Sequence, residues 1–143
     1  MGLILDSNVL IQAERNSRTH SFAQFADYGT AYISAITVSE LLVGVHLANS
    51  EARRNQRKAF VEGVLTLFPA LEFSAATARI HAELYASLRQ KGELIGAHDL
   101  IIAATALQHG FAILTGNVRE FKRIPGLTVL SFLQMRDTQI LND

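Results

Sequence analysis

The chain has 143 residues, 13 basic and 13 acidic side chains, and a hydrophobic content of 49%. This size and balance predict one folded domain spanning residues 1–143 and exclude an intrinsically disordered chain. The absence of cysteine excludes thiolate zinc sites, redox motifs and disulfide scaffolds. Because the net charge is zero, any binding to nucleic acid must depend on local basic patches, metal ions or assembly into a dimer.

The N-terminus carries no signal for export, since it lacks a basic region followed by a long apolar run. No apolar run approaches the roughly 20 residues that a membrane-spanning helix requires. We therefore expect a cytoplasmic protein that does not use a membrane as a partner.

Short apolar runs and amphipathic segments alternate along the first half of the chain. Residues 3–5 are expected to form a buried strand that ends in a turn at residues 6–8. Residues 31–34 resemble a second strand, and Thr37 is expected to open a helix with apolar residues at helical spacing. The basic residues 53–58 lead into a further amphipathic segment.

Clear start and stop signals mark the helices of the second half. After a short strand at residues 71–73, Ser74 is expected to cap a helix that Gly92 ends. Asp99 begins a segment that is apolar nearly all round, so this helix should be buried, and Gly110 ends it.

Residues 112–115 and 128–130 complete the set of expected strands. Strands that alternate with helices predict an α/β domain with three layers, α/β/α, around a mainly parallel central sheet. In such sheets, functional sites form beyond the carboxyl ends of the strands.

Acidic residues fall repeatedly at that edge of the expected sheet. Asp6 directly follows the first strand, Glu40 lies in the first turn of the helix after the second strand, and Asp99 begins the buried helix. Asn117 and Glu120 follow a later strand. Four connections that are far apart in the sequence are thus expected to meet at one edge.

Clustered carboxylates need a positive counter-charge. Two carboxylates about 4 Å apart repel by roughly 4 kcal/mol at an effective dielectric constant near 20. A hard divalent cation removes this repulsion, and oxygen-rich sites suit Mg²⁺ or Mn²⁺. Cations held in this way support the hydrolysis of phosphodiesters.

Each acid also has a purely structural interpretation. Asp6 could cap the following turn, Glu40 could form a capping box with Thr37, and Asp99 could be favoured by a helix dipole. These interpretations do not explain why all three acids lie at one edge.

A glycine next to the expected site also favours the functional interpretation. Gly44 follows Glu40 by one turn of the helix and leaves open space beside its carboxylate.

Four segments with the sequences LILDSNVL, ITVSELLVG, GAHDLIIAA and LTGNVREF, the last followed by IPG, occur in series at residues 3–10, 36–44, 96–104, 114–121 and 124–126. Together they resemble the PIN-domain nucleases and, within them, the VapC toxins of bacterial toxin–antitoxin pairs. Any one segment is weakly specific, whereas four in the expected order are strongly specific and cover nearly the whole chain.

The resemblance implies a PIN fold and an endoribonuclease that depends on Mg²⁺ or Mn²⁺ and acts on structured RNA, with tRNA as one candidate. It implies metal-binding and catalytic roles for Asp6, Glu40 and Asp99. In the family a fourth acid often follows the strand of the last segment. In this chain Asn117 occupies the corresponding position, and Glu120 lies three residues further on.

The remaining assignments concern substrate and partners. We assign Glu120 to the catalytic set, and substrate contacts to Ser7, Asn117 and Arg119. By resemblance, the partners are a VapB-type antitoxin, whose C-terminal segment covers the acidic site, and a second copy in a homodimer. Two basic groups could contact phosphates or simply face solvent: Arg53, Arg54, Arg57 and Lys58, and, nearer the expected site, Arg119, Lys122 and Arg123.

Three other classes of protein share parts of this sequence pattern. A haloacid-dehalogenase-like phosphatase needs a second acid two residues after the first, where this chain has Asn8. A housekeeping PIN-domain nuclease and a PIN scaffold that only binds partners stay open, although the scaffold is disfavoured because all three core acids are present. The RNA that is cut and the number of cations are not predicted by the sequence.

Overall fold

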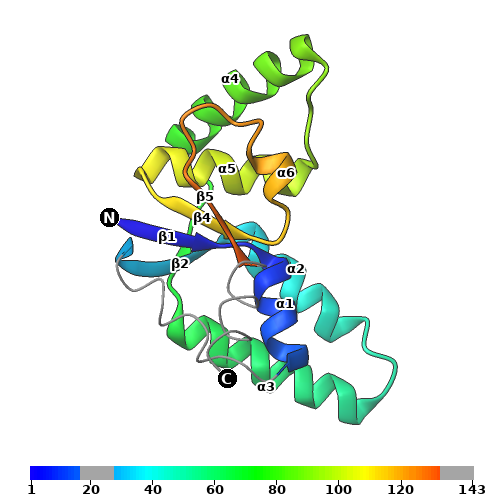
Figure 1. The fold of residues 1–143 in the computed structure, drawn as a ribbon. Helices are drawn as coiled ribbons and strands as arrows, with labels where there is room; N and C mark the ends of the chain where they lie inside the picture. Colours follow the sequence, from blue (N-terminus) through cyan, green and yellow to red (C-terminus); the bar gives the residue numbers. More distant parts are fainter. Residues whose placement is uncertain (17–27, 133–143) are drawn as a thin grey trace, which may run out of the picture.

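The computed structural model describes residues 1–16 and 28–132 of the chain (Figure 1). In this part, five strands and six helices follow one another in the order β1 (Gly2–Leu5), α1 (Ser7–Asn16), β2 (Thr30–Ser34), α2 (Ala35–His46), α3 (Glu51–Leu67), β3 (Ala70–Leu71), α4 (Ala75–Lys91), α5 (Ala97–His109), β4 (Ala112–Thr115), α6 (Val118–Phe121) and β5 (Val129–Ser131). No helix within these described ranges combines the length and apolar character needed to cross a membrane.

The strands form one sheet in the order β3-β2-β1-β4-β5, and every neighbouring pair is parallel. The predicted, mainly parallel sheet is therefore confirmed. In the central pair, Leu3 lies opposite Ala112 and Leu5 opposite Leu114. From β1 the chain adds β2 and β3 on one side and later β4 and β5 on the other, so the strand order reverses between β1 and β4. A site at the carboxyl ends of these two strands is the arrangement that such a reversal favours.

Alternate residues of the central strands supply the two hydrophobic cores. Leu3, Leu5 and Leu114 pack with α1, α2 and α3, whereas Ile4 and Ile113 pack with α4, α5 and α6. Figure 1 shows α4, α5 and α6 on one side of the sheet and α1 and α3 on the other. The three-layer α/β/α arrangement predicted from the sequence is confirmed, because buried parallel strands need helices on both faces.

The predicted helix signals of the second half are confirmed. The Ser74 hydroxyl accepts a hydrogen bond from the Thr77 amide and begins α4. Gly92 and Gly110 end α4 and α5 with φ of 68°, a conformation that glycine adopts without steric cost. Helix α5 carries six buried residues, as its apolar sequence predicts.

The turn predicted directly after Asp6 is wrong, because α1 begins at Ser7. The Asp6 carbonyl accepts a hydrogen bond from the Val9 amide at 3.1 Å, which starts the helical turn. Val9, Leu10 and Ala13 are buried and lie on one face of the helix. Tertiary packing of this narrow apolar face outweighs the turn preference of the polar residues that precede it.

The predicted start of α2 is also wrong. The helix begins at Ala35, and Ser34 caps it by accepting a hydrogen bond from the Ile36 amide at 3.3 Å. Thr37 is buried inside the helix, so the capping box with Glu40 does not form. Glu40 lies in the second turn instead of the first, and its side chain is available to the site.

The remaining differences concern ends of elements. Helix α5 begins at Ala97, two residues before the predicted start. The edge strands β3 and β5 are displaced from the predicted residues 71–73 and 128–130, and the short helix α6 was not foreseen. Edge strands pair on one side only, so the local hydrophobic pattern does not fix their register.

Candidate active site

The predicted acidic residues meet beyond the carboxyl ends of β1 and β4. Asp6 follows β1, Glu40 comes from α2, Asp99 from the first turn of α5, and Glu120 from α6. The charges of Asp6, Glu40 and Glu120 all act on the carboxyl group of Asp99. Four elements of the fold therefore bring four carboxylates into one electrostatic cluster.

Asp6 is the most deeply placed of these acids, with only 3% of its surface exposed. The Thr115 hydroxyl donates to Oδ2 at 2.7 Å, and the Ser7 amide donates to Oδ1 at 2.8 Å. Burial raises the pKa of the Asp6 carboxyl, and these hydrogen bonds act in the opposite direction. The surroundings thus hold a buried carboxylate in one fixed orientation.

The hydroxyl group of Ser7 connects Glu40 with Asp6. The Ser7 hydroxyl lies 3.2 Å from Glu40 Oε2 and 3.5 Å from Asp6 Oδ1, so this hydroxyl lies between the two carboxylates. Glu40 Oε1 is buried and accepts no hydrogen bond from the described residues, although Nδ1 of His98 lies 3.7 Å away. A buried carboxylate oxygen without a donor is costly unless a cation or a ligand group reaches it.

Asp99 and Glu120 are linked through Asn117. The side-chain amide of Asn117 donates to Asp99 Oδ2 at 3.2 Å and to Glu120 Oε2 at 3.1 Å. Burial, and next the charge of Asp6, raise the pKa of Asp99 to about 6, while the hydrogen bond from Asn117 lowers it. The sequence left open whether Asn117 or Glu120 completes the cluster, and the structure places both there.

The cluster is not drawn together as tightly as a metal shell. Across residues 1–16 and 28–132, no three Asp, Glu or His side chains are close enough to hold one metal ion as they stand. Burial raises the pKa of Asp99 most, and the charges of the three other carboxylates raise it further, so closer approach of these groups would be unfavourable without a cation. Asp6 and Glu40 share the Ser7 hydroxyl, and Asp99 and Glu120 share the Asn117 amide, so two linked pairs of carboxylates make up the cluster.

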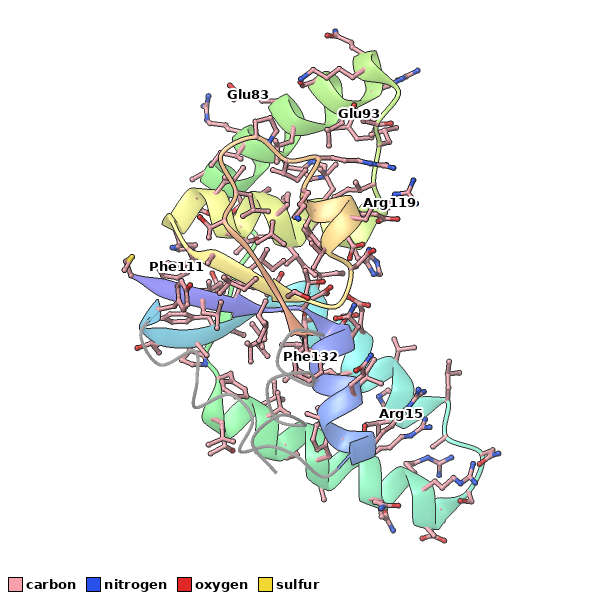
Figure 2. All side chains as sticks on the ribbon, in the orientation of Figure 1. Arg15, Glu83, Glu93, Phe111, Arg119 and Phe132 are labelled. Atoms are coloured by element: carbon pink, nitrogen blue, oxygen red, sulfur yellow. The ribbon has the colours of Figure 1, made fainter. Side chains whose placement is uncertain are left out.

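The residues assigned to substrate contact differ in their surroundings. The Ser7 hydroxyl is engaged with the site's own carboxylates, and the amide of Asn117 with two more. Arg119 is exposed on α6 (Figure 2) and is the member of this set whose side chain faces solvent. Arg123 donates one hydrogen bond to the Leu94 carbonyl at 3.1 Å, so one N–H group of its guanidinium is already used within the chain.

Two residues that support the site were missed by the sequence reasoning. The sequence marks Thr115 only as the end of a strand, yet its hydroxyl donates a hydrogen bond to Asp6. Asn8 accepts a hydrogen bond from the Gly116 amide at 3.3 Å and so ties the start of α1 to the end of β4. Both contacts depend on which strands are neighbours, and no local pattern in the sequence carries that information.

Comparison with known proteins agrees with this architecture. The family model described as PIN domain matches residues 3–127. Ribonuclease VapC1 of Rickettsia felis is 44% identical over 131 residues, which cover 92% of this chain and 96% of the relative. The tRNA(fMet)-specific endonuclease VapC of Salmonella typhimurium is 32% identical over 127 residues, covering 88% and 94% of the two chains.

A solved structure extends the likeness to three dimensions. A crystal structure of VapBC2 from Rickettsia felis, bound to a DNA fragment from their promoter, has a chain that superimposes with a TM-score of 0.83 at 30% identity. The match covers 92% of this chain and 99% of the other. The chain belongs to the PIN-domain family and, within it, to the VapC ribonucleases, which confirms the family that the four sequence segments predicted.

Proposed function

We propose that this chain is a metal-dependent endoribonuclease that acts as the toxin of a VapBC-type toxin–antitoxin pair. It hydrolyses phosphodiester bonds of structured RNA, and tRNA is the first substrate to test because one relative is named as tRNA(fMet)-specific. The observation that carries the proposal is the convergence of Asp6, Glu40, Asp99 and Glu120 at the strand-order reversal between β1 and β4.

The proposed cofactor is Mg²⁺ or Mn²⁺, held by Asp6, Glu40 and Asp99. Three observations support this fit: the donors are all carboxylate oxygens, Glu40 Oε1 is buried without a hydrogen bond, and the neighbouring negative charges raise the pKa of Asp99. A divalent cation at these carboxylates would offset the charge that develops on a phosphodiester and favour the deprotonation of a nearby water molecule.

The chain's own residues position this chemistry. Thr115 and the Ser7 amide fix the orientation of the Asp6 carboxylate, and the Ser7 hydroxyl holds Glu40 beside it. Asn117 keeps Asp99 and Glu120 within reach of one another in spite of their like charge. This fixed arrangement lowers the cost of orienting the reacting groups.

The proposed partners follow from the family. A VapBC2 chain that matches this fold was solved as a toxin–antitoxin complex on promoter DNA. That likeness supports a VapB-type antitoxin as the protein partner of this chain. The homodimer stays a proposal made from the family resemblance alone. The cytoplasm is the proposed site of action, because cellular RNA is the proposed substrate.

The function is tested with purified protein and an initiator tRNA transcript. Cleavage is expected with Mg²⁺ or Mn²⁺ and is expected to stop when a chelator is added. Asp6→Asn should abolish cleavage while the free energy of unfolding stays equal or rises, because a buried charge is removed. Glu83→Gln, at an exposed acid on α4 (Figure 2), is the matched control and should cut like the wild type.

Two results would contradict the proposal. Cleavage that continues unchanged in the chelator would exclude the metal. Unfolding of the Asp6→Asn protein would show that this carboxylate mainly caps the structure. If the tRNA transcript is not cut, sequencing the 5′ ends of cellular RNA after brief expression will identify the substrate, and the absence of any new 5′ end would reject the ribonuclease.

A further inference from the structure

A groove leads away from the acidic cluster between α1, α2 and α3. It has a volume of about 530 Å³, which lies within the roughly 300–1,000 Å³ typical of ligand pockets. Glu40, one of the proposed catalytic carboxylates, lines it, so the groove opens onto the site. Its lining also includes Ile11, Leu41 and Val61, which provide apolar surface.

Three arginines from two helices line the same groove. Arg15 comes from the last turn of α1, and Arg53 and Arg57 lie one helical turn apart on α3. In Figure 2, Arg15 lies at the end of α1, where this helix approaches α2 and α3. Among the residues that the structure describes, three guanidinium groups and two carboxylates, those of Glu14 and Glu40, line the groove, so this lining has an excess of positive charge.

In the part of the chain that the structure describes, no carboxylate lies within 4.0 Å of the charged nitrogens of these arginines. The contact of this kind that is found there is between His98 and Glu40. Arg57 donates to the Gly44 carbonyl at 2.9 Å, and Arg53 donates to Asn49 Oδ1 at 3.4 Å. These neutral acceptors hold two guanidiniums in place but leave their charge uncompensated. A row of unpaired, positioned guanidiniums is suited to bind phosphate oxygens.

We infer that the groove between α1, α2 and α3 binds the phosphate backbone of the RNA substrate through Arg15, Arg53 and Arg57. The inference rests on the proposed ribonuclease function and extends it from the cleaved bond to the adjoining nucleotides. Among the described residues, no Trp, Tyr, Phe or His lines the groove, so this part of the chain offers no aromatic ring on which bases stack. The contacts therefore add affinity and orientation without selecting a base sequence.

Gly44 gives the groove its width. It lines the groove, and a Cβ atom built on it would meet no described atom beyond the backbone of its own helix within 4 Å. A larger side chain at this position is therefore accommodated by the fold but occupies the space proposed for RNA. Gly63 on α3 is a matched control, because a Cβ there also meets nothing within 4 Å, and Gly63 does not line this groove.

The first test removes charge. Arg15→Gln, Arg57→Gln and the double variant are compared with Arg79→Gln, which changes an exposed arginine on α4. The assays are cleavage of an initiator tRNA transcript and binding of the same RNA in EDTA at several salt concentrations. Each groove variant should raise KM and Kd about tenfold with kcat within about twofold. The slope of log Kd against log salt should fall by roughly 0.7–0.9 per arginine removed.

Arg57→Lys separates the effect of the charge from the effect of the hydrogen bond to Gly44. Because lysine keeps the positive charge, this variant should have most of the salt dependence that Arg57→Gln loses. If the lost contact with Gly44 were the cause, Arg57→Lys would bind RNA as weakly as Arg57→Gln. The second test narrows the groove: Gly44→Leu should raise KM at least tenfold with an unchanged Tm, whereas Gly63→Leu should leave KM as in the wild type.

The outcomes distinguish this inference from the proposed function. If the wild type cuts RNA and the groove variants match it in KM, Kd and salt slope, the inference is wrong and the ribonuclease stands. If the wild type cuts no RNA, the proposed function fails by itself. Groove variants that lose a co-purifying antitoxin but keep the wild-type Kd for RNA would assign the groove to the protein partner and overturn the inference.

Discussion

Thr115 donates a hydrogen bond of 2.7 Å to Oδ2 of Asp6, a residue 109 positions earlier in the chain. The contact extends the register of β1 and β4, in which Leu5 lies opposite Leu114. The same hydroxyl accepts a hydrogen bond from the backbone amide of Asn117 at 2.9 Å. One side chain thus connects the most buried acid of the site with the loop that carries Asn117.

Replacing this hydroxyl with a methyl group should disturb the site without changing the packed volume much. In Thr115→Val the Asp6 carboxylate loses a donor in a buried position, so the pKa of Asp6 should rise further. We expect the free energy of unfolding at pH 7.5 to fall by about 1.5–3 kcal/mol, measured by urea denaturation in a chelator.

Thr115→Ser is the control for that variant, because it keeps the donor and removes only a methyl group. It should retain the activity and most of the stability of the wild type. A Val variant as stable as the wild type would show that the hydrogen bond to Asp6 adds no stability, and a loss confined to the Ser variant would assign the stabilising effect to the methyl group.

Asp99 should make the stability of the metal-free protein depend on pH. Its pKa in the folded state, about 6, lies above the ordinary value of 3.8, so the folded state holds the proton more tightly than the unfolded state. Stability should therefore fall as the pH rises from about 4 through about 6, by about 1–2 kcal/mol from this half-buried group, whose interactions solvent partly screens. Denaturant unfolding at a series of pH values in a chelator measures the slope.

Asp99→Asn should flatten this profile. The amide imitates the protonated acid, so the variant should be more stable than the wild type at pH 7.5 and nearly equal to it at pH 4. Added Mg²⁺ should stabilise the wild type and have little effect on the variant. Glu93→Gln, at an exposed acid outside the cluster (Figure 2), should leave the wild-type profile intact. A wild-type stability that rises between pH 4 and 6 would contradict the raised pKa of Asp99.

Asn117 separates two carboxylates, and its conversion to an acid should be costly. Asn117→Asp removes the donor to Asp99 and Glu120 and adds a further negative charge. Without divalent cations we expect the free energy of unfolding at pH 7.5 to fall by about 1–3 kcal/mol, and saturating Mg²⁺ to restore most of it.

Asn117→Ala removes the donor alone and serves as the comparison for the Asp variant. It should lose less stability, and Mg²⁺ should rescue it less. If the two variants lose the same stability and respond equally to Mg²⁺, the added charge is not felt by the other acids, and Asn117 does not lie within their cluster.

The parts of the fold that the sequence predicted are those set by local chemistry. Short apolar runs mark the central strands, and Ser74, Gly92 and Gly110 mark helix ends by their side-chain oxygen or lack of a side chain. Helix α1 was missed because its buried residues become a recognisable face only when packed against the sheet. The four-residue α6 is too short to show a helical period at all.

The candidate site divides in the same way. Asp6, Glu40 and Asp99 were found because an acid at the end of a strand or the start of a helix is a visible signal. The partnership of Thr115 with Asp6 and the double hydrogen bond of Asn117 depend on the pairing of β1 with β4. Arg15 was missed together with α1, since its place in the groove depends on that helix.

Gly29 sets how closely the chain can approach β1 at the start of β2. Its φ is 92°, and a Cβ atom added there would lie 2.0 Å from the carbonyl oxygen of Met1. Gly29→Ala must therefore move the backbone next to the pairing of Gly2 with Thr30, and we expect a loss of about 3 kcal/mol or more in the free energy of unfolding. Gly92 also has a positive φ, of 68°, but a Cβ atom there meets open space. Gly92→Ala should therefore lower the free energy of unfolding by only about 1–2 kcal/mol. Urea denaturation of both variants separates the steric effect from the cost of positive φ, and equal losses would show that residue 29 does not press against Met1.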